Sequence, residues 1–166
     1  MSTHNATLNL ELEVRELLSS GIETGIITRR LRELVTLNTG TSNGQINKAL
    51  YQRRTTTLAS TALLGGFSDE DGVAMNFDEV VLMAIRNRST TAANYLTLAS
   101  ADNFGLIATP PGFWTDATGT VVIPANSLWL VYFIDGIPCA AGSDNIDITV
   151  AAGADAYDLI ILGRDN

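Results

Sequence analysis

Hydrophobic and polar residues alternate strictly near the start of the chain. Between residues 6 and 15, every second position is apolar: Leu8, Leu10, Leu12 and Val14. Successive side chains of a β-strand point to opposite faces, so this pattern predicts a half-buried strand.

The next segment, "GIITRRLRELVTLNTG" at residues 25–40, fits two structures equally well. Ile27, Leu31, Leu34 and Val35 match the apolar stripe of a helix that Gly40 could cap, and the same residues fit a strand. The glycine- and asparagine-containing stretch "NTGTSNG" at 38–44 then predicts a turn or flexible loop. We therefore divide the chain into an N-terminal arm with the first strand, residues 1–40, and a main domain, residues 41–166.

The main domain alternates short apolar runs with turn signals. The run at 80–85 is apolar on both faces, which is typical of a central buried strand, although a helix stays open there. The threonines at 55–57 favour an extended, partly exposed strand, and residues 65–77 favour a loop. Further strands are expected at 95–98 and in "TVVIP", "SLWLVYF", "IDITVAA" and "YDLIILG", with a turn at Asp135 and Gly136.

Together these elements predict an all-β fold, an antiparallel β-sandwich or jelly-roll-like domain with an extended N-terminal arm. The run at 157–163 is apolar on both faces, and an exposed apolar edge invites aggregation. We expect this strand to lie inside a sheet, near "SLWLVYF" or "IDITV".

Charge and hydropathy narrow the set of partners. The 166-residue chain has 18 Asp and Glu against 10 Lys and Arg, giving a net charge of −8. This balance argues against nucleic acid as a partner, because phosphate binding needs clustered cations. No window approaches the ~18 apolar residues of a membrane span, so we expect no membrane partner and synthesis in a cytoplasm.

Five residues are candidates for an interface. Arg29 and Arg30, with Arg53 and Arg54, could form a basic patch for an acidic protein surface, although solvated or ion-paired arginines explain the same residues. Trp114 stands in a loop rich in proline and glycine, where an exposed aromatic anchor is expected.

Candidate chemistry is sparse. The single histidine, His4, lies in a polar N-terminal tail, and the single cysteine, Cys139, reads as a small buried apolar residue. The carboxylates at 69–71 do not follow the ligand spacing of an EF-hand, which leaves a solvated acidic turn, or an irregular calcium site that includes Asp78. We therefore expect no catalytic, cofactor-binding or metal-binding residues, and a protein that is not an enzyme.

Four segments follow one another along the chain: "TGTSNGQINKALYQRRTTTLAS", "VVLMAIRNRSTTAANYLTLA", "WTDATGTVVIPANSLWLVYFIDG" and "IDITVAAGADAYDLIILG". In this order they resemble a family of small head proteins of tailed bacteriophages that decorate the capsid. Family members share a turn before a "V-x-I/V-x-P-x-G" strand and a last strand "YDIIIIG". This chain has "PANS" where the family usually has "PGG", and its first 35 residues match less clearly.

The resemblance implies a decoration, or cement, protein that binds the outer surface of the major capsid protein shell in the virion and stabilises it. It implies a homotrimer or another homo-oligomer, with no catalytic residues. Two alternatives stay open: a tail, baseplate or fibre-attachment structural protein, and a carbohydrate-binding module that uses Trp114.

Overall fold

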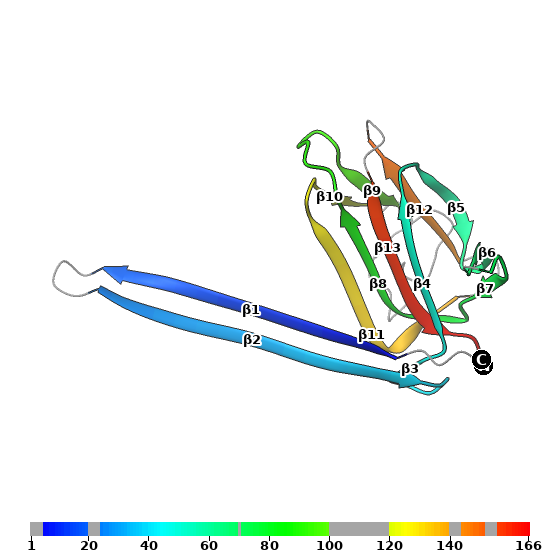
Figure 1. The fold of residues 1–166 in the computed structure, drawn as a ribbon, viewed down its shortest axis with the longest axis horizontal. Coiled ribbons are helices and arrows are strands. Elements are labelled where there is room, and N and C mark those ends of the chain that lie inside the picture. Colours follow the sequence, from blue (N-terminus) through cyan, green and yellow to red (C-terminus); the bar gives the residue numbers. More distant parts are fainter. Residues whose placement is uncertain (1–4, 20–23, 70, 100–119, 140–143, 152–155) are drawn as a thin grey trace.

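A computed structural model describes residues 5–19, 24–69, 71–99, 120–139, 144–151 and 156–166. It consists of a long N-terminal hairpin, here called the arm, and a β-sandwich (Figure 1). The arm contains β1 (Ala6–Ser19) and β2 (Thr24–Thr39), and the short β3 (Gln45–Ile46) pairs with the end of β2. No helix in the described part of the chain has the length and apolar character needed to cross a membrane.

Two four-stranded antiparallel sheets form the sandwich, as the sequence predicts. One has the order β11-β8-β13-β4 and the other β10-β9-β12-β5. The first sheet, here called the arm-side sheet, contains β4 (Lys48–Arg54), β8 (Glu79–Asn87), β11 (Leu128–Pro138) and β13 (Tyr157–Arg164). The second contains β5 (Leu58–Ala62), β9 (Leu96–Ala99), β10 (Thr120–Ile123) and β12 (Asn145–Val150).

One hydrophobic core lies between the two sheets. Alternate positions of β8, such as Met83 and Ile85, are fully buried against residues of the opposite sheet, such as Leu98 and Ile148. Both sheets thus bury one face against the other, which is the defining packing of a sandwich. The all-β prediction is confirmed.

The prediction of central buried strands holds for β8 and β13. β8 lies between β11 and β13, and β13 lies between β8 and β4. The last strand is therefore inside a sheet, as expected. It lies in the same sheet as "SLWLVYF", which belongs to β11, but β8 stands between them, and "IDITV" belongs to β12 in the other sheet, so it pairs with neither segment.

The arm settles the ambiguity between helix and strand at residues 25–40 in favour of strand. β1 pairs with β2 in an unbroken antiparallel register from Ala6↔Leu37 to Ser19↔Thr24. These 14 pairs, at a rise of about 3.3 Å each, give an arm about 45 Å long. Figure 1 shows the arm projecting away from the sandwich.

Three smaller expectations were wrong. Asp135 and Gly136 do not close a turn: they form a bulge within β11, which pairs with β8 on both sides of them. The loop expected at 65–77 contains a hairpin of β6 (Leu64–Ser68) and β7 (Ala74–Asn76). The threonines at 55–57 lie in the bend between β4 and β5, where the chain crosses between sheets.

Candidate assembly interface

The base of the arm is packed onto the outer face of the arm-side sheet. Leu37 of β2, Ile46 of β3 and Val81 of β8 are completely buried in a second hydrophobic cluster, separate from the sandwich core. Tyr132 of β11 and Leu162 of β13 pack against this cluster. The arm therefore has a fixed, apolar base.

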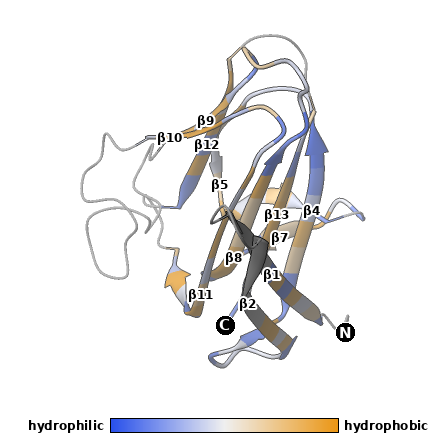
Figure 2. Cartoon of the chain, turned by 90° about the vertical axis from the view of Figure 1, so that its left-hand side faces the viewer, coloured by the Kyte–Doolittle hydropathy of each residue, from blue (hydrophilic) through white to orange (hydrophobic). Residues whose placement is uncertain are grey.

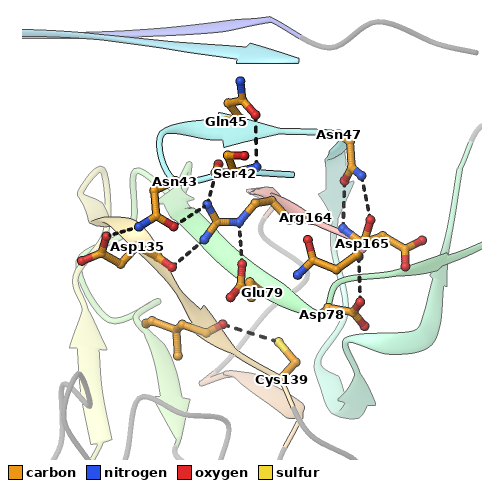
Figure 3. Close-up of polar contacts among 12 residues, drawn as sticks. Ser42, Asn43, Gln45, Asn47, Asp78, Glu79, Asp135, Cys139, Arg164 and Asp165 are labelled. Carbon is orange, nitrogen blue, oxygen red and sulfur yellow. Dashed lines mark hydrogen bonds and ion pairs between the residues drawn. The ribbon is translucent and has the colours of Figure 1, made fainter. Parts of the chain in front are cut away.

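A buried arginine fastens the same base through polar contacts (Figure 3). The side chain of Arg164, at the end of β13, is 1% exposed. Its Nη1 donates to the carbonyl oxygen of Ser42 at 2.8 Å and to Oδ1 of Asn43 at 3.5 Å. Its Nη2 donates to the carbonyl oxygen of Asp135, and its Nε donates to Oε2 of Glu79, both at 2.5 Å. We call this set the Arg164 clamp; it joins the loop after the arm to β8, β11 and β13.

A second set of contacts reinforces the clamp from the other side. Asn47 and Asp165 exchange two hydrogen bonds of 2.8 Å, between the Asn47 amide group and the Asp165 backbone. Lys48 Nζ lies 3.0 Å from Asp165 Oδ2, and the backbone N–H of Asn166 donates to Asp78 at 2.8 Å. The end of β13 thus holds both the strand that follows the arm and the start of β8.

The bulge at Gly136 makes room for the clamp. Gly136 has φ +74°, a conformation that L-residues with side chains rarely adopt, and a Cβ built there would collide with Nη2 of Arg164. This explains why the Asp-Gly pair serves as a bulge beside Arg164.

Above the arm base, one row of the outer face of the arm-side sheet is apolar, and the row beyond it is mostly charged. Residues that alternate with the core positions point to this face, and the strand register arranges them in rows across the sheet. Figure 2 looks onto this sheet, with the arm coming towards the viewer. Tyr51 of β4 and Leu128 of β11, on the two edge strands, are each 60% exposed. Leu128 pairs with Arg86, in the row that also holds Asp158 and Arg53. The middle row is Leu130, Ala84, Ile160 and Tyr51.

A charged cluster borders this face at the end opposite the arm. Asp158 accepts hydrogen bonds from Arg88 at 2.8 Å, from Arg53 at 3.0 Å and from Tyr51 at 3.2 Å. Burial raises the pKa of Asp158, but these three donors outweigh it and hold the pKa below its ordinary value. Asp158 is therefore a carboxylate at neutral pH.

The structure does not bring the four candidate arginines together. Arg53 is ion-paired with Asp158, and Arg54 donates to Oε1 of Gln52 at 2.6 Å, both at the far end of β4. Arg29 and Arg30 lie on the arm, at register positions opposite Val14 and Glu13. Ion pairing with Asp158 accounts for Arg53. Trp114 lies outside the described residues.

A groove of about 910 Å³ runs in the corner between the arm and the arm-side sheet. Its lining includes Leu34 of β2, which is 68% exposed, and Ile134 of β11, which is 53% exposed. The backbone N–H of Gly44 donates to the carbonyl oxygen of Ile134 at 3.1 Å, which ties this wall to the loop after the arm. The corner thus offers exposed aliphatic side chains on both walls.

Cys139 follows the end of β11 and is partly buried. Burial raises the pKa of its thiol, and the nearby carboxylates Asp144, Asp78 and Glu79 raise it further. Its Sγ lies 4.0 Å from the carbonyl oxygen of Ile137 (Figure 3). The thiol is held in its protonated form, which is the inert form of cysteine.

The side chain of Asp69 bonds to the backbone that follows it. Oδ1 of Asp69 accepts the N–H groups of Asp71 at 3.0 Å and Val73 at 2.8 Å, as aspartate in a turn commonly does. Within the described ranges, no three His, Cys, Asp or Glu side chains are grouped so that they could hold a metal ion.

Sequence reasoning missed the Arg164 clamp, the most extensively bonded polar group of this region. Its signal was weak: one arginine next to Gly163, with partners up to 122 positions away. Comparisons of the chain with protein-family models, with curated proteins and with solved structures find no match in any of the three.

Proposed function

We propose that this chain is a structural protein of a bacteriophage virion, a capsid decoration protein that binds the outer surface of the major capsid protein shell and stabilises it. In this role the protein acts by burying its own surface against a larger assembly. The observation that carries the proposal is the arm, a two-stranded ribbon about 45 Å long that is packed on the sandwich at its base and projects from it.

A free two-stranded ribbon of this length is a poor structure for a protein that acts alone. An isolated hairpin is at best marginally stable in water, because it has no second layer to cover its apolar residues. Leu10 and Leu34 of the arm are 42% and 68% exposed. A surface that covers these residues would stabilise the arm, and an assembly of many subunits supplies such a surface.

The rigid base supports the same role. The buried cluster of Leu37, Ile46 and Val81 and the Arg164 clamp fix how the arm leaves the sandwich. Pre-organisation of this kind lowers the entropy that binding must overcome. The negative net charge of −8 suits the outside of a capsid better than the inside, where packaged DNA would repel it.

Quantitative mass spectrometry of purified particles of the encoding phage tests this proposal. A decoration protein is expected at a copy number comparable to that of the major capsid protein. Replacing the arm residue Leu34, which is 68% exposed, with glutamate should lower this occupancy. Val122→Glu should not, because Val122 is also more than half exposed, at 54%, but lies on β10 of the other sheet.

Two results would refute the proposal. Absence of the chain from mature particles would exclude a virion role altogether. A copy number in the tens or lower, with the protein found on isolated tails, would replace it with the tail or fibre-attachment alternative.

A further inference from the structure

The loop that the Arg164 clamp holds contains Asn43, the only asparagine of the chain that is followed by a glycine. We propose that Asn43 is a site of spontaneous deamidation, that the closed clamp protects it, and that a copy whose clamp has opened is marked irreversibly at this residue. The inference concerns the purified protein alone, so it stands or falls independently of the virion role.

An asparagine followed by glycine is more reactive than other asparagines. Glycine has no side chain, so its backbone nitrogen can approach the side-chain carbon Cγ of the residue before it. The nitrogen of Gly44 forms a bond to Cγ of Asn43, the bond from Cγ to Nδ2 breaks, and Nδ2 leaves as ammonia with the proton of the Gly44 N–H. Water then opens the resulting cyclic imide at either carbonyl, which gives aspartate or isoaspartate.

The structure holds all three reacting groups in hydrogen bonds (Figure 3). The leaving group, Nδ2 of Asn43, donates to Oδ1 of Asp135 at 2.7 Å. The side-chain oxygen of Asn43 accepts from Nη1 of Arg164 at 3.5 Å. The attacking nitrogen, that of Gly44, donates to the carbonyl oxygen of Ile134 at 3.1 Å. Ring closure requires the side chain of Asn43 to turn towards this nitrogen, so the three contacts oppose the reaction.

Hydrogen bonding, rather than burial, provides the protection. Asn43 is exposed, so water and hydroxide reach its side chain. Arg164 holds the same loop through the carbonyl oxygen of Ser42, to which Nη1 donates at 2.8 Å. When Arg164 releases this carbonyl, one bond of Asn43 and one of Gly44, both to β11, still hold the reactive pair. Local opening of the loop therefore controls the reaction.

The clamp does not close again in its original form after Asn43 has reacted. The aspartate product carries a carboxylate where the amide donated, and this carboxylate faces that of Asp135. Like charges at hydrogen-bond distance repel each other. Arg164 lies close by but is already bonded to Glu79, so it offsets only part of the repulsion. An isoaspartate also lengthens the backbone before Gly44 and displaces the N–H that bonds to β11.

Peptide mass spectrometry of the purified full-length chain, incubated at mildly alkaline pH, tests the protection. Trypsin releases residues 33–48 as one peptide, because no Lys or Arg lies between Arg32 and Lys48. Deamidation raises the mass of this peptide, and fragmentation assigns the change to Asn43. The folded wild type is expected to react at least about tenfold more slowly than the chain unfolded in urea.

Two variants open the loop and one control does not. Arg164→Met should raise the deamidation rate about tenfold, because it removes a charged donor that holds the loop. Asp135→Ala removes the acceptor of the Asn43 amide but keeps the carbonyl that Arg164 uses, so it should also raise the rate and serves if Arg164→Met does not fold. Leu98→Ala is the matched control, because it destabilises the whole domain from the core of the other sheet and should react at close to the wild-type rate.

Hydrogen exchange at the amide of Gly44 tests the irreversible mark. Asn43→Asp imitates the aspartate product and should exchange this amide about tenfold faster than the wild type. Thr41→Asp is its control, since it places the same charge at an exposed position of the same loop and should exchange at the wild-type rate.

Three results would overturn the inference. A folded wild type that reacts as fast as the unfolded chain, or unchanged rates in both Arg164→Met and Asp135→Ala, would exclude protection by the clamp. Equal rates in Leu98→Ala and Arg164→Met would show that the reaction follows global unfolding. Unchanged exchange at Gly44 in Asn43→Asp would show that the modified loop closes as before.

Discussion

Replacing Arg164 with methionine should destabilise the protein more than any other single arginine substitution among the described residues. Methionine keeps much of the length and volume of the side chain but removes all its donors. The carbonyl oxygens of Ser42 and Asp135 and the carboxylate of Glu79 then lose their hydrogen bonds to the guanidinium. The arm base should loosen as a result.

The size of the effect follows from the burial of these groups. Arg164 is 1% exposed, whereas the side chain of Glu79 is 28% exposed and regains water when its partner is lost. Breaking a buried ion pair by removing one partner typically costs about 3–5 kcal/mol, and the partial exposure of Glu79 places this case at about 3 kcal/mol. Domains are stable by only about 5–15 kcal/mol, so this loss is a large fraction of the total.

Urea unfolding followed by circular dichroism measures this loss. With a slope of about 2 kcal/mol per molar urea, the midpoint should fall by about 1.5 M. Arg164→Lys should lie between the wild type and Arg164→Met, because lysine keeps the charge but not the forked donor geometry. Hydrogen exchange should accelerate at the amide of Gly44, which bonds to β11 beside the clamp.

Arg53→Met is the matched control. Arg53 is also ion-paired with a carboxylate, but its side chain is 53% exposed and water replaces the lost contact. Its substitution should have a clearly smaller effect. Equal midpoints for the two methionine variants would refute the reasoning, because burial would then not decide the contribution of these arginines.

Three further predictions concern single residues. The pKa of Asp158 is lowered in the folded state, so the carboxylate stabilises the protein fully above about pH 4 and loses this effect as the pH falls through the lowered pKa. The stability of Asp158→Asn against acid should therefore depend less on pH in that range than the stability of the wild type. Identical pH profiles of the two proteins would contradict this. Cys139 should react with a thiol reagent at pH 8 only after unfolding, and rapid labelling of the folded protein would disprove its protection. Gly136→Ala should destabilise the folded protein by about 1–3 kcal/mol, through backbone strain and a collision with Arg164. Gly72 is also at positive φ but has open space around it, so Gly72→Ala should destabilise the protein less. The reverse order would exclude the collision as the cause.

The position of a segment could be predicted where its pattern of apolar residues left little choice of surroundings. The continuous apolar run of β8 fits only a strand or helix buried on all sides, and the strict alternation of β1 fits only a strand. At residues 25–40 the spacing suited both helix and strand. Pairing with β1 decided the outcome, and pairing is a property of two segments that neither one carries alone.

The wrong expectations share a physical cause. Asp-Gly at 135 and 136 suits a turn or a bulge, and the choice depends on β8, which continues past it as a partner. The neighbours of β13 depend on how eight strands are distributed between two sheets. Arg164 gave no local sign of its role, because its partners Ser42, Glu79 and Asp135 lie on three separate segments.

The position of β13 also sets the order of events during biosynthesis. β13 follows the other strands of the described residues, yet it lies between β4 and β8 and pairs with both of them. A nascent chain on the ribosome therefore holds the arm-side sheet open until β13 emerges, and contacts so distant in sequence form slowly. Arg164 ends the same strand, so the hydrogen bonds of the Arg164 clamp form only after β13 is in place. Before that, the base of the arm lacks these bonds, and the edges of β4 and β8 are free to pair with a wrong strand.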